Sequence, residues 1–139
     1  MRKVIEIAKK ELGVKEIAGG KHNARIIEYH KTCTMKAESD EVSWCAAFVN
    51  WCLIQANLRG TNLANARSYL KWGVSYLDKP EIGDICVFWR GSKESTQGHV
   101  GFYMGENETH ISVLGGNQGN AVSIMDYPKI RLLDIRRTA

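Results

Sequence analysis

The sequence predicts an α+β fold, in which N-terminal helices pack on a C-terminal antiparallel β-sheet of about five to six strands. Two observations lead to this prediction. Residues 2–56 contain segments of helical character, whereas residues 83–136 contain short apolar runs separated by Gly and Asn. Helices followed by strands are typical of the α+β class. Because 139 residues is an ordinary length for one domain, we expect residues 1–139 to form a single domain.

The first two helices are short and amphipathic. Residues 2–12 have apolar positions at helical spacing, and Gly13 is a good terminator. A loop is expected over residues 13–22. Residues 23–31 form a second candidate helix that Asn23 would cap.

The third helix is expected to be buried. From Ser43 to Ala56 the sequence reads SWCAAFVNWCLIQA, without Gly or Pro, and it follows a polar loop over residues 34–42. Such a long apolar segment is typical of a core helix, and Ser43 is a suitable N-cap. A further short helix is expected near residues 64–72, ending at Gly73.

The strands follow in the second half of the chain. Apolar and β-branched residues recur in short runs, and Gly and Asn lie between several of them, which favours antiparallel hairpins. The runs span residues 85–89, 99–104, 109–114, 121–125 and 130–136.

Composition narrows the range of partners. The net charge of +4 and the pI near 8.9 are compatible with nucleic acid, an anionic membrane or a cell wall. The basic residues are spread along the chain, so we expect no nucleic-acid partner. No apolar run reaches the roughly 18–20 residues of a membrane span. The charged N-terminus does not resemble a signal peptide, so we expect synthesis in a cytoplasm and no stable membrane insertion.

One of the four cysteines differs from the others in its context. No CxxC pair is present, which argues against a metal site or a redox pair. Cys52 and Cys86 lie within apolar runs and are expected in the core, while Cys33 follows a helix and is expected to be exposed. Cys45 lies in the first turn of the predicted buried helix. Free N–H groups and the helix dipole there favour a nucleophilic thiolate.

A cysteine nucleophile needs a base, and histidine is the usual one. Among the four histidines, His99 stands at the head of a predicted strand, directly after Gly98. The base in turn needs an orienting group. Asn117, in the Gly-Gly-Asn segment after the next strand, is a candidate, although the same segment is typical of a turn.

Taken together, four segments are more specific than any of these residues alone. They read DEVSWCAAFVNW from Asp40, GDICVF from Gly83, GHVGFY from Gly98 and VLGGNQ from Val113. In this order and spacing they resemble the papain-like cell-wall hydrolases of the CHAP and NlpC type, most closely small phage-associated members. The resemblance covers roughly residues 40–136 and implies a papain-like α+β fold.

Transferred residue by residue, the resemblance assigns the catalytic roles. Cys45 matches the nucleophile, His99 the base and Asn117 the third polar residue. Some CHAP members carry a Glu two residues before that Asn, where this chain has Gly115. Trp44 is expected to contact substrate. Three further residues are expected to contact substrate or to substitute in the third role: Gln118, Glu41 and Asp40.

The implied activity is hydrolysis of peptidoglycan through a thioester acyl-enzyme. The enzyme would be a cysteine peptidase or an N-acetylmuramoyl-L-alanine amidase, needing no metal or cofactor. It would act as a monomer in the periplasm or wall, in the manner of an endolysin. A holin would release it from the host cytoplasm.

Three alternatives remain open at this stage. The same enzyme could be a delivered antibacterial toxin held by an immunity protein. The chain could be a non-catalytic phage structural or wall-binding module. It could also be an amidase or transferase for a small molecule, which would need a closed pocket in place of an open groove.

Overall fold

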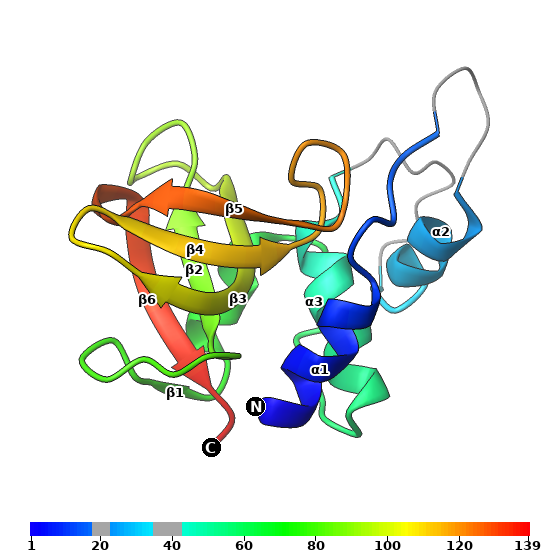
Figure 1. Ribbon diagram of the computed structural model, residues 1–139, viewed down its shortest axis with the longest axis horizontal. Helices are drawn as coiled ribbons and strands as arrows, with labels where there is room; N and C mark the ends of the chain where they lie inside the picture. Colours follow the sequence, from blue (N-terminus) through cyan, green and yellow to red (C-terminus); the bar gives the residue numbers. More distant parts are fainter. Residues whose placement is uncertain (18–22, 35–42) are drawn as a thin grey trace.

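The computed structural model describes residues 1–17, 23–34 and 43–139, and it has the predicted helix-then-strand order (Figure 1). The helical part comprises α1 (Arg2–Lys10), α2 (Ala24–His30), α3 (Cys45–Gln55) and the 3₁₀ turn η1 (Ala66–Lys71). The second half holds the strands, which are β1 (Val74–Ser75), β2 (Ile85–Trp89), β3 (Gly98–Glu106), β4 (His110–Gly115), β5 (Ser123–Pro128) and β6 (Leu132–Arg137), with the 3₁₀ turn η2 (Lys129–Arg131) before β6.

The strands form one antiparallel sheet of order β1-β6-β2-β3-β4-β5, which confirms the predicted fold class. Figure 1 shows the three α-helices gathered beside this sheet. Hairpins connect β2 to β3, β3 to β4 and β4 to β5, as the Gly and Asn turns predicted. The C-terminal strand then returns to the other edge of β2, so β2 and β3 lie in the middle of the sheet.

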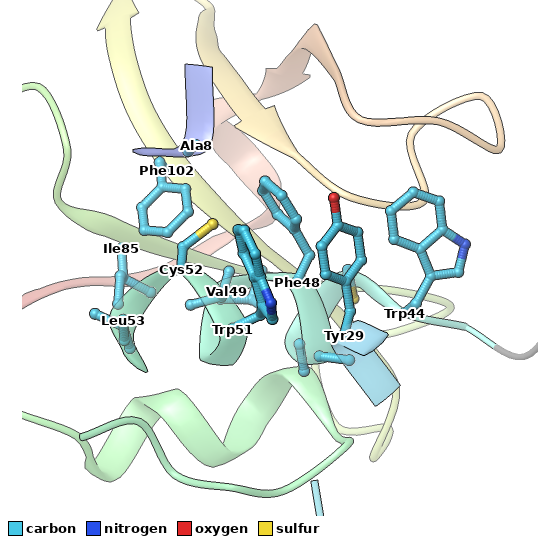
Figure 2. Packing of buried hydrophobic residues seen from close by; sticks show 14 of the residues in the cluster. Ala8, Tyr29, Trp44, Phe48, Val49, Trp51, Cys52, Leu53, Ile85 and Phe102 are labelled. Carbon is cyan, nitrogen blue, oxygen red and sulfur yellow. The ribbon is translucent and has the colours of Figure 1, made fainter. Parts of the chain in front are cut away.

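The main core lies between α3 and the sheet. Residues Cys45 to Leu53 of α3 are all buried, which agrees with the unbroken apolar run of the sequence. Tyr29 of α2 packs edge-on against Phe48 and Trp51, at centroid distances of 5.2 Å each. Phe48 packs edge-on in turn against Phe102 of the sheet, at 6.3 Å, and Figure 2 shows these residues in the core. A helix surrounded in this way holds its first residue, Cys45, in a fixed place.

Several local expectations need correction. The first residue of α3 is Cys45 and its N-cap is Trp44, so Ser43 is not the cap, and the Trp44 side chain makes no capping hydrogen bond. The helix α1 ends at Lys10, and Leu12 is 42% exposed. Cys33, expected at the surface, is buried because the turn after α2 folds onto the core. By contrast, Asn23 caps α2 as predicted, accepting a hydrogen bond from the backbone N–H of Arg25 at 2.8 Å.

The strand boundaries shift by a few residues. The last predicted strand begins at residue 132, because residues 129–131 form a 3₁₀ turn. The segment predicted at 121–125 becomes a strand from residue 123 onward. Before it, Ala121 pairs with Lys15 as an isolated bridge, and Val122 donates to the carbonyl of Val14 at 2.7 Å. These bonds join the β4–β5 loop to the segment after α1.

A buried ion pair joins the start of β2 to the end of β6. Asp84, fully buried before β2, accepts hydrogen bonds from Nε and Nη2 of Arg137, both at 2.7 Å, and from the backbone N–H of Glu81 at 2.8 Å. The carboxylate raises the pKa of Arg137 through this hydrogen bond. The Gly-Asp segment of the sequence is thus a structural link between β2 and the C-terminal strand.

We expect Asp84→Ala to reduce the free energy of unfolding by about 3 kcal/mol or more, because it leaves a largely buried guanidinium without its partner. Urea unfolding of the purified variant measures this. Glu81→Gln is the matched control. The Glu81 side chain is 72% exposed and contacts the same arginine at 3.5 Å, so its loss should cost less than about 1 kcal/mol. Equal costs for the two variants would contradict the structural role of Asp84.

Candidate active site

The N-terminus of α3 presents Cys45 with free backbone donors. The first helical hydrogen bond runs from the N–H of Phe48 to the carbonyl of Trp44, so the N–H groups of Cys45, Ala46 and Ala47 lack an intrahelical acceptor. Together with the positive end of the helix dipole, they favour negative charge at this position. Cys45 is 3% exposed.

His99 is the second residue of β3 and is held from several sides. It is paired with Phe88 across β2, and it is 3% exposed. Its ring stacks on Tyr127 of β5, with centroids 4.8 Å apart and an interplanar angle of 18°. Tyr127 stacks in turn on Phe88 at 5.1 Å. An imidazole fixed in this way can keep one hydrogen-bond partner at each of its two ring nitrogens.

The Cys45 thiol interacts with His99, and this changes its acidity. Burial raises the pKa of Cys45, but hydrogen bonds from His99, from the backbone of Val100 and from Ser43 lower it, as does the charge interaction with His99. The lowering contributions prevail, and the pKa is about 7 against an ordinary value of 9.0. A large fraction of Cys45 is therefore thiolate near neutral pH, as a nucleophile requires.

The second ring nitrogen of His99 is held by Gln118. The amide oxygen Oε1 lies 2.8 Å from His99 Nε2. The amide nitrogen of Gln118 donates to the carbonyls of Val113, at 3.1 Å, and Ser123, at 2.8 Å. Because both amide hydrogens are used on carbonyls, the oxygen must face the imidazole, and Nε2 must carry the proton. Nδ1 is then the basic nitrogen left for Cys45.

The absence of a side chain at Gly115 makes room for this arrangement. A Cβ at Gly115 would lie 2.6 Å from Oε1 of Gln118 and 3.5 Å from Nε2 of His99. The space that a side chain at this position would fill is therefore occupied by Gln118. This explains physically how the chain lacks the Glu that some CHAP members carry here and still places an oxygen on the histidine.

Asn117 has a different contact from the one expected for the third catalytic residue. Its side chain donates to Oγ of Ser43 at 3.3 Å, and its backbone has a φ of 58°. Ser43 in turn contacts the Cys45 thiol. Asn117 therefore lies on the thiol side of the site, and the oxygen on His99 comes from its neighbour, Gln118, whose side chain is 2% exposed.

Of the remaining predicted substrate contacts, Trp44 is the one among the described residues, and it does not line the site. Trp44 is fully buried and cannot stack on a sugar, which corrects that expectation. Its ring stacks on Tyr29 at 5.9 Å, its Nε1 donates to Glu16 at 2.9 Å, and a Cβ at Gly116 would lie 2.7 Å from it. Asp40 and Glu41 lie outside the described residues.

The other cysteines have no such activation. Burial raises the pKa of Cys33, and raises those of Cys52 and Cys86 well above the ordinary value. All four cysteines are free thiols. The hydrogen bond with Thr32 lowers the pKa of Cys33, but burial prevails there. The chemical difference between Cys45 and the rest is therefore its contact with His99.

A hollow of about 280 Å³ lies beside the nucleophile. Cys45 and Ser43 line one side, Asn65 and its neighbours line another, and the β2–β3 hairpin lines the rest. Within the described parts of the chain, no group of three or more His, Cys, Asp or Glu side chains could hold a metal ion. The arrangement of thiol, imidazole and amide suits acyl transfer.

A comparison with protein-family models places this site in a known family. The model of the CHAP domain matches residues 37–117, which includes Cys45, His99 and Asn117. The chain belongs to the CHAP domain family. No curated protein matches it in sequence.

Solved structures with NlpC/P60 domains share the fold of this CHAP chain. RipD from Mycobacterium tuberculosis has a TM-score of 0.60 at 17% identity, over 99% of this chain and 96% of that one; it is described as a non-catalytic NlpC/p60 domain protein adapted to peptidoglycan binding. NlpC1 from Trichomonas vaginalis has a TM-score of 0.59 at 19% identity, over 96% of this chain and 42% of that one.

A Staphylococcus aureus protein similar to a lipoprotein of the NLP/P60 family has a TM-score of 0.56 at 15% identity, over 99% of this chain and 41% of that one. The chain thus spans about two fifths of the length of this protein and of NlpC1. At these identities the likeness concerns the fold. In the described ranges, no helix of the CHAP chain is long and apolar enough to cross a membrane.

Proposed function

We propose that the chain is a peptidoglycan hydrolase that cleaves an amide or peptide bond of the wall peptide by a Cys-His thiol mechanism. The observation that carries the proposal is the Cys45 thiol, with a pKa of about 7, in contact with an imidazole whose far nitrogen is held by Gln118. CHAP membership supports the substrate class. The net charge of +4 suits an anionic wall.

The proposed reaction begins with attack of the Cys45 sulfur on the amide carbonyl carbon. The backbone N–H of Cys45 is the proposed donor to the oxyanion. Protonated His99 then gives its Nδ1 proton to the departing amine as the C–N bond breaks, which leaves a thioester. His99 next takes a proton from water, the hydroxide attacks the thioester, and the acid and the free thiol are released. Gln118 orients the ring through both steps.

We further propose that residues 1–139 act as one catalytic domain. Its core is continuous from α1 through α3 to the sheet, and the site lies where α3 meets β3. An endolysin role, with release from a host cytoplasm by a holin, fits the resemblance to small phage-associated members. The cleaved bond is either the amide between the muramyl group and the peptide or a bond within the peptide. The two cleavages give different products, which mass spectrometry distinguishes.

The alternative with a specific observation behind it is a wall-binding module, because RipD, with this fold, is described as non-catalytic and adapted to peptidoglycan binding. In this chain, however, the Cys45 thiol contacts the His99 imidazole, which in turn contacts the Gln118 amide. Binding alone would need none of the three groups, so these contacts favour the enzyme. A delivered toxin with an immunity protein would use the same chemistry and differ in its partner.

Incubation of purified sacculi with wild type and with Cys45→Ala tests the proposal. We expect wild type to release muropeptides and Cys45→Ala to release none above background, because no other described thiol is activated. Cys33→Ala is the control, since Cys33 is a free thiol without these contacts. Mass spectrometry of the products identifies the bond. Folded wild type that binds sacculi from both wall types but releases nothing would refute the enzyme and favour the binding module.

A further inference from the structure

Part of the wall of the hollow is the β2–β3 hairpin, which is held by several hydrogen bonds. The backbone of Arg90 pairs with Gln97, N–H to carbonyl, at 3.3 Å, and Ser95 Oγ donates to the carbonyl of Arg90 at 2.6 Å. From outside the hairpin, Arg67 donates to the carbonyls of Gln97, Lys93 and Ser92 at 2.8, 2.9 and 3.0 Å. These bonds fix the backbone from which Arg90 projects.

Among the described residues that line the hollow with Cys45, Arg90 is the one that carries a charge. No hydrogen bond or ion pair engages its guanidinium within the described structure. Three other arginines near the sheet have partners within the protein. Arg67 donates hydrogen bonds to backbone carbonyls, Arg136 forms an ion pair with Asp134, and Arg137 forms one with Asp84. An exposed guanidinium on a fixed backbone, in a hollow beside a nucleophile, is available for a ligand.

The positive charge of Arg90 also acts on the catalytic side of the hollow. Burial raises the pKa of Tyr127 to about 12, with a contribution from Cys45, and Arg90 opposes this rise. Tyr127 is the ring that stacks on His99. Arg90 therefore lies within electrostatic reach of the Tyr127 ring, which packs on His99.

We propose that Arg90 forms an anion subsite that binds a carboxylate of the acyl-donor peptide next to the scissile amide. A guanidinium offers two parallel N–H donors to a carboxylate, which fixes orientation as well as charge. The proposal deepens the proposed function, on which it rests for the identity of the peptide. It assigns to the hydrolase a preference for acidic peptides over their carboxamide forms.

Alkylation of Cys45 tests the subsite without any need for hydrolysis. Iodoacetate and iodoacetamide react with a thiolate in the same way, with sulfur displacing iodide, but iodoacetate carries a carboxylate. The two rates are measured by peptide mass spectrometry at a pH well above the Cys45 pKa of about 7. We expect the iodoacetate-to-iodoacetamide rate ratio to fall about fivefold to tenfold in Arg90→Gln, and Arg90→Lys to retain part of it.

Arg2→Gln is the matched control, because it removes the same charge from an exposed position on α1. An unchanged ratio in Arg90→Gln would overturn the subsite. An equal fall in Arg2→Gln would also overturn it, since the effect would then reflect net charge.

A substrate pair gives the second measurement. With a wall peptide and its carboxamide form, Arg90→Gln should raise KM about tenfold for the carboxylate and leave the carboxamide unchanged. Equal changes for both peptides would contradict carboxylate binding. If neither peptide is cleaved by wild type, the proposed function fails, and the alkylation ratio still decides whether the anion subsite exists.

Discussion

His99→Asn is expected to raise the pKa of the Cys45 thiol from about 7 to above its ordinary value of 9.0 and to lower kcat/KM by about 10⁴-fold or more. Two contributions that lower this pKa, a hydrogen bond and a charge interaction, come from His99, while burial raises it. Without the imidazole, burial would prevail over the remaining contacts. The departing amine would also lose its proton donor.

The pH dependence of Cys45 alkylation by iodoacetamide measures the first effect directly. Wild type should show a midpoint near pH 7, and His99→Asn should still be rising at the most alkaline pH at which it stays folded. Thermal unfolding and circular dichroism confirm that the variant is intact. A midpoint that stays near pH 7 in His99→Asn would mean that the helix N-terminus, the backbone of Val100 and Ser43 activate the thiol without the imidazole.

The same shift predicts how stability varies with pH. The pKa of Cys45 is lower in the folded protein than in the unfolded one, so ionisation of the thiol favours folding. This contribution is complete above the ordinary pKa of 9.0, and it is lost as the pH falls through about 7. We compare the free energy of unfolding of wild type with that of Cys45→Ala. Between pH 7 and pH 9 their difference should rise by at most about 1.4 kcal/mol per pH unit.

The position of Cys45 in the fold could be predicted from the sequence because its signal is local. An apolar run without Gly or Pro can bury itself only as a helix or strand, and its length favours a helix. The helix boundary then places Cys45 in the first turn, where the structure has it. His99 could be selected with the help of the family motif, because strand order alone does not show which histidine faces the helix.

The position of the orienting oxygen could not be predicted from spacing. Asn117 and Gln118 are adjacent in a turn, where Asn117 has a positive φ. The side chain of Gln118 faces His99, whereas that of Asn117 faces Ser43. Likewise, an aromatic residue next to a nucleophile, such as Trp44, has the same sequence pattern whether it lines a groove or fills the core. Close packing against Gly116 directs it inward, and that contact joins residues far apart in the chain.

Gln118→Leu is expected to lower kcat by about 10²- to 10³-fold with a small change in KM, because His99 loses the acceptor that fixes its tautomer. A ring free to put its proton on Nδ1 cannot accept the thiol proton there. The substitution also leaves the carbonyls of Val113 and Ser123 without their donor. We therefore expect the free energy of unfolding to fall by about 1–3 kcal/mol, which urea unfolding measures alongside the kinetics.

Gln118→Glu tests whether a negative charge next to His99 can replace the amide that orients its ring. A carboxylate could hold the His99 proton, as in Ser-His-Asp triads, but it cannot donate to the two carbonyls, which lie 3.1 and 2.8 Å from the present amide nitrogen. Ionised Glu would face two carbonyl oxygens, so we expect this variant to be less stable and less active than wild type, most clearly at a pH where the carboxyl ionises. Activity equal to or above wild type would show that the carbonyl contacts are dispensable.

Asn117→Gly is the control that decides between the two neighbouring side chains. Glycine keeps the positive φ of residue 117 without strain, so the variant removes only the 3.3 Å hydrogen bond to Ser43. We expect less than about tenfold loss of kcat/KM, since one neutral hydrogen bond contributes about 1 kcal/mol.

The pH midpoint of Cys45 alkylation also distinguishes the two variants. In Gln118→Leu this midpoint should rise, because a misoriented His99 ring no longer lowers the thiol pKa. In Asn117→Gly the midpoint should move little. If Asn117→Gly lost as much activity as Gln118→Leu, Asn117 would be the third catalytic residue.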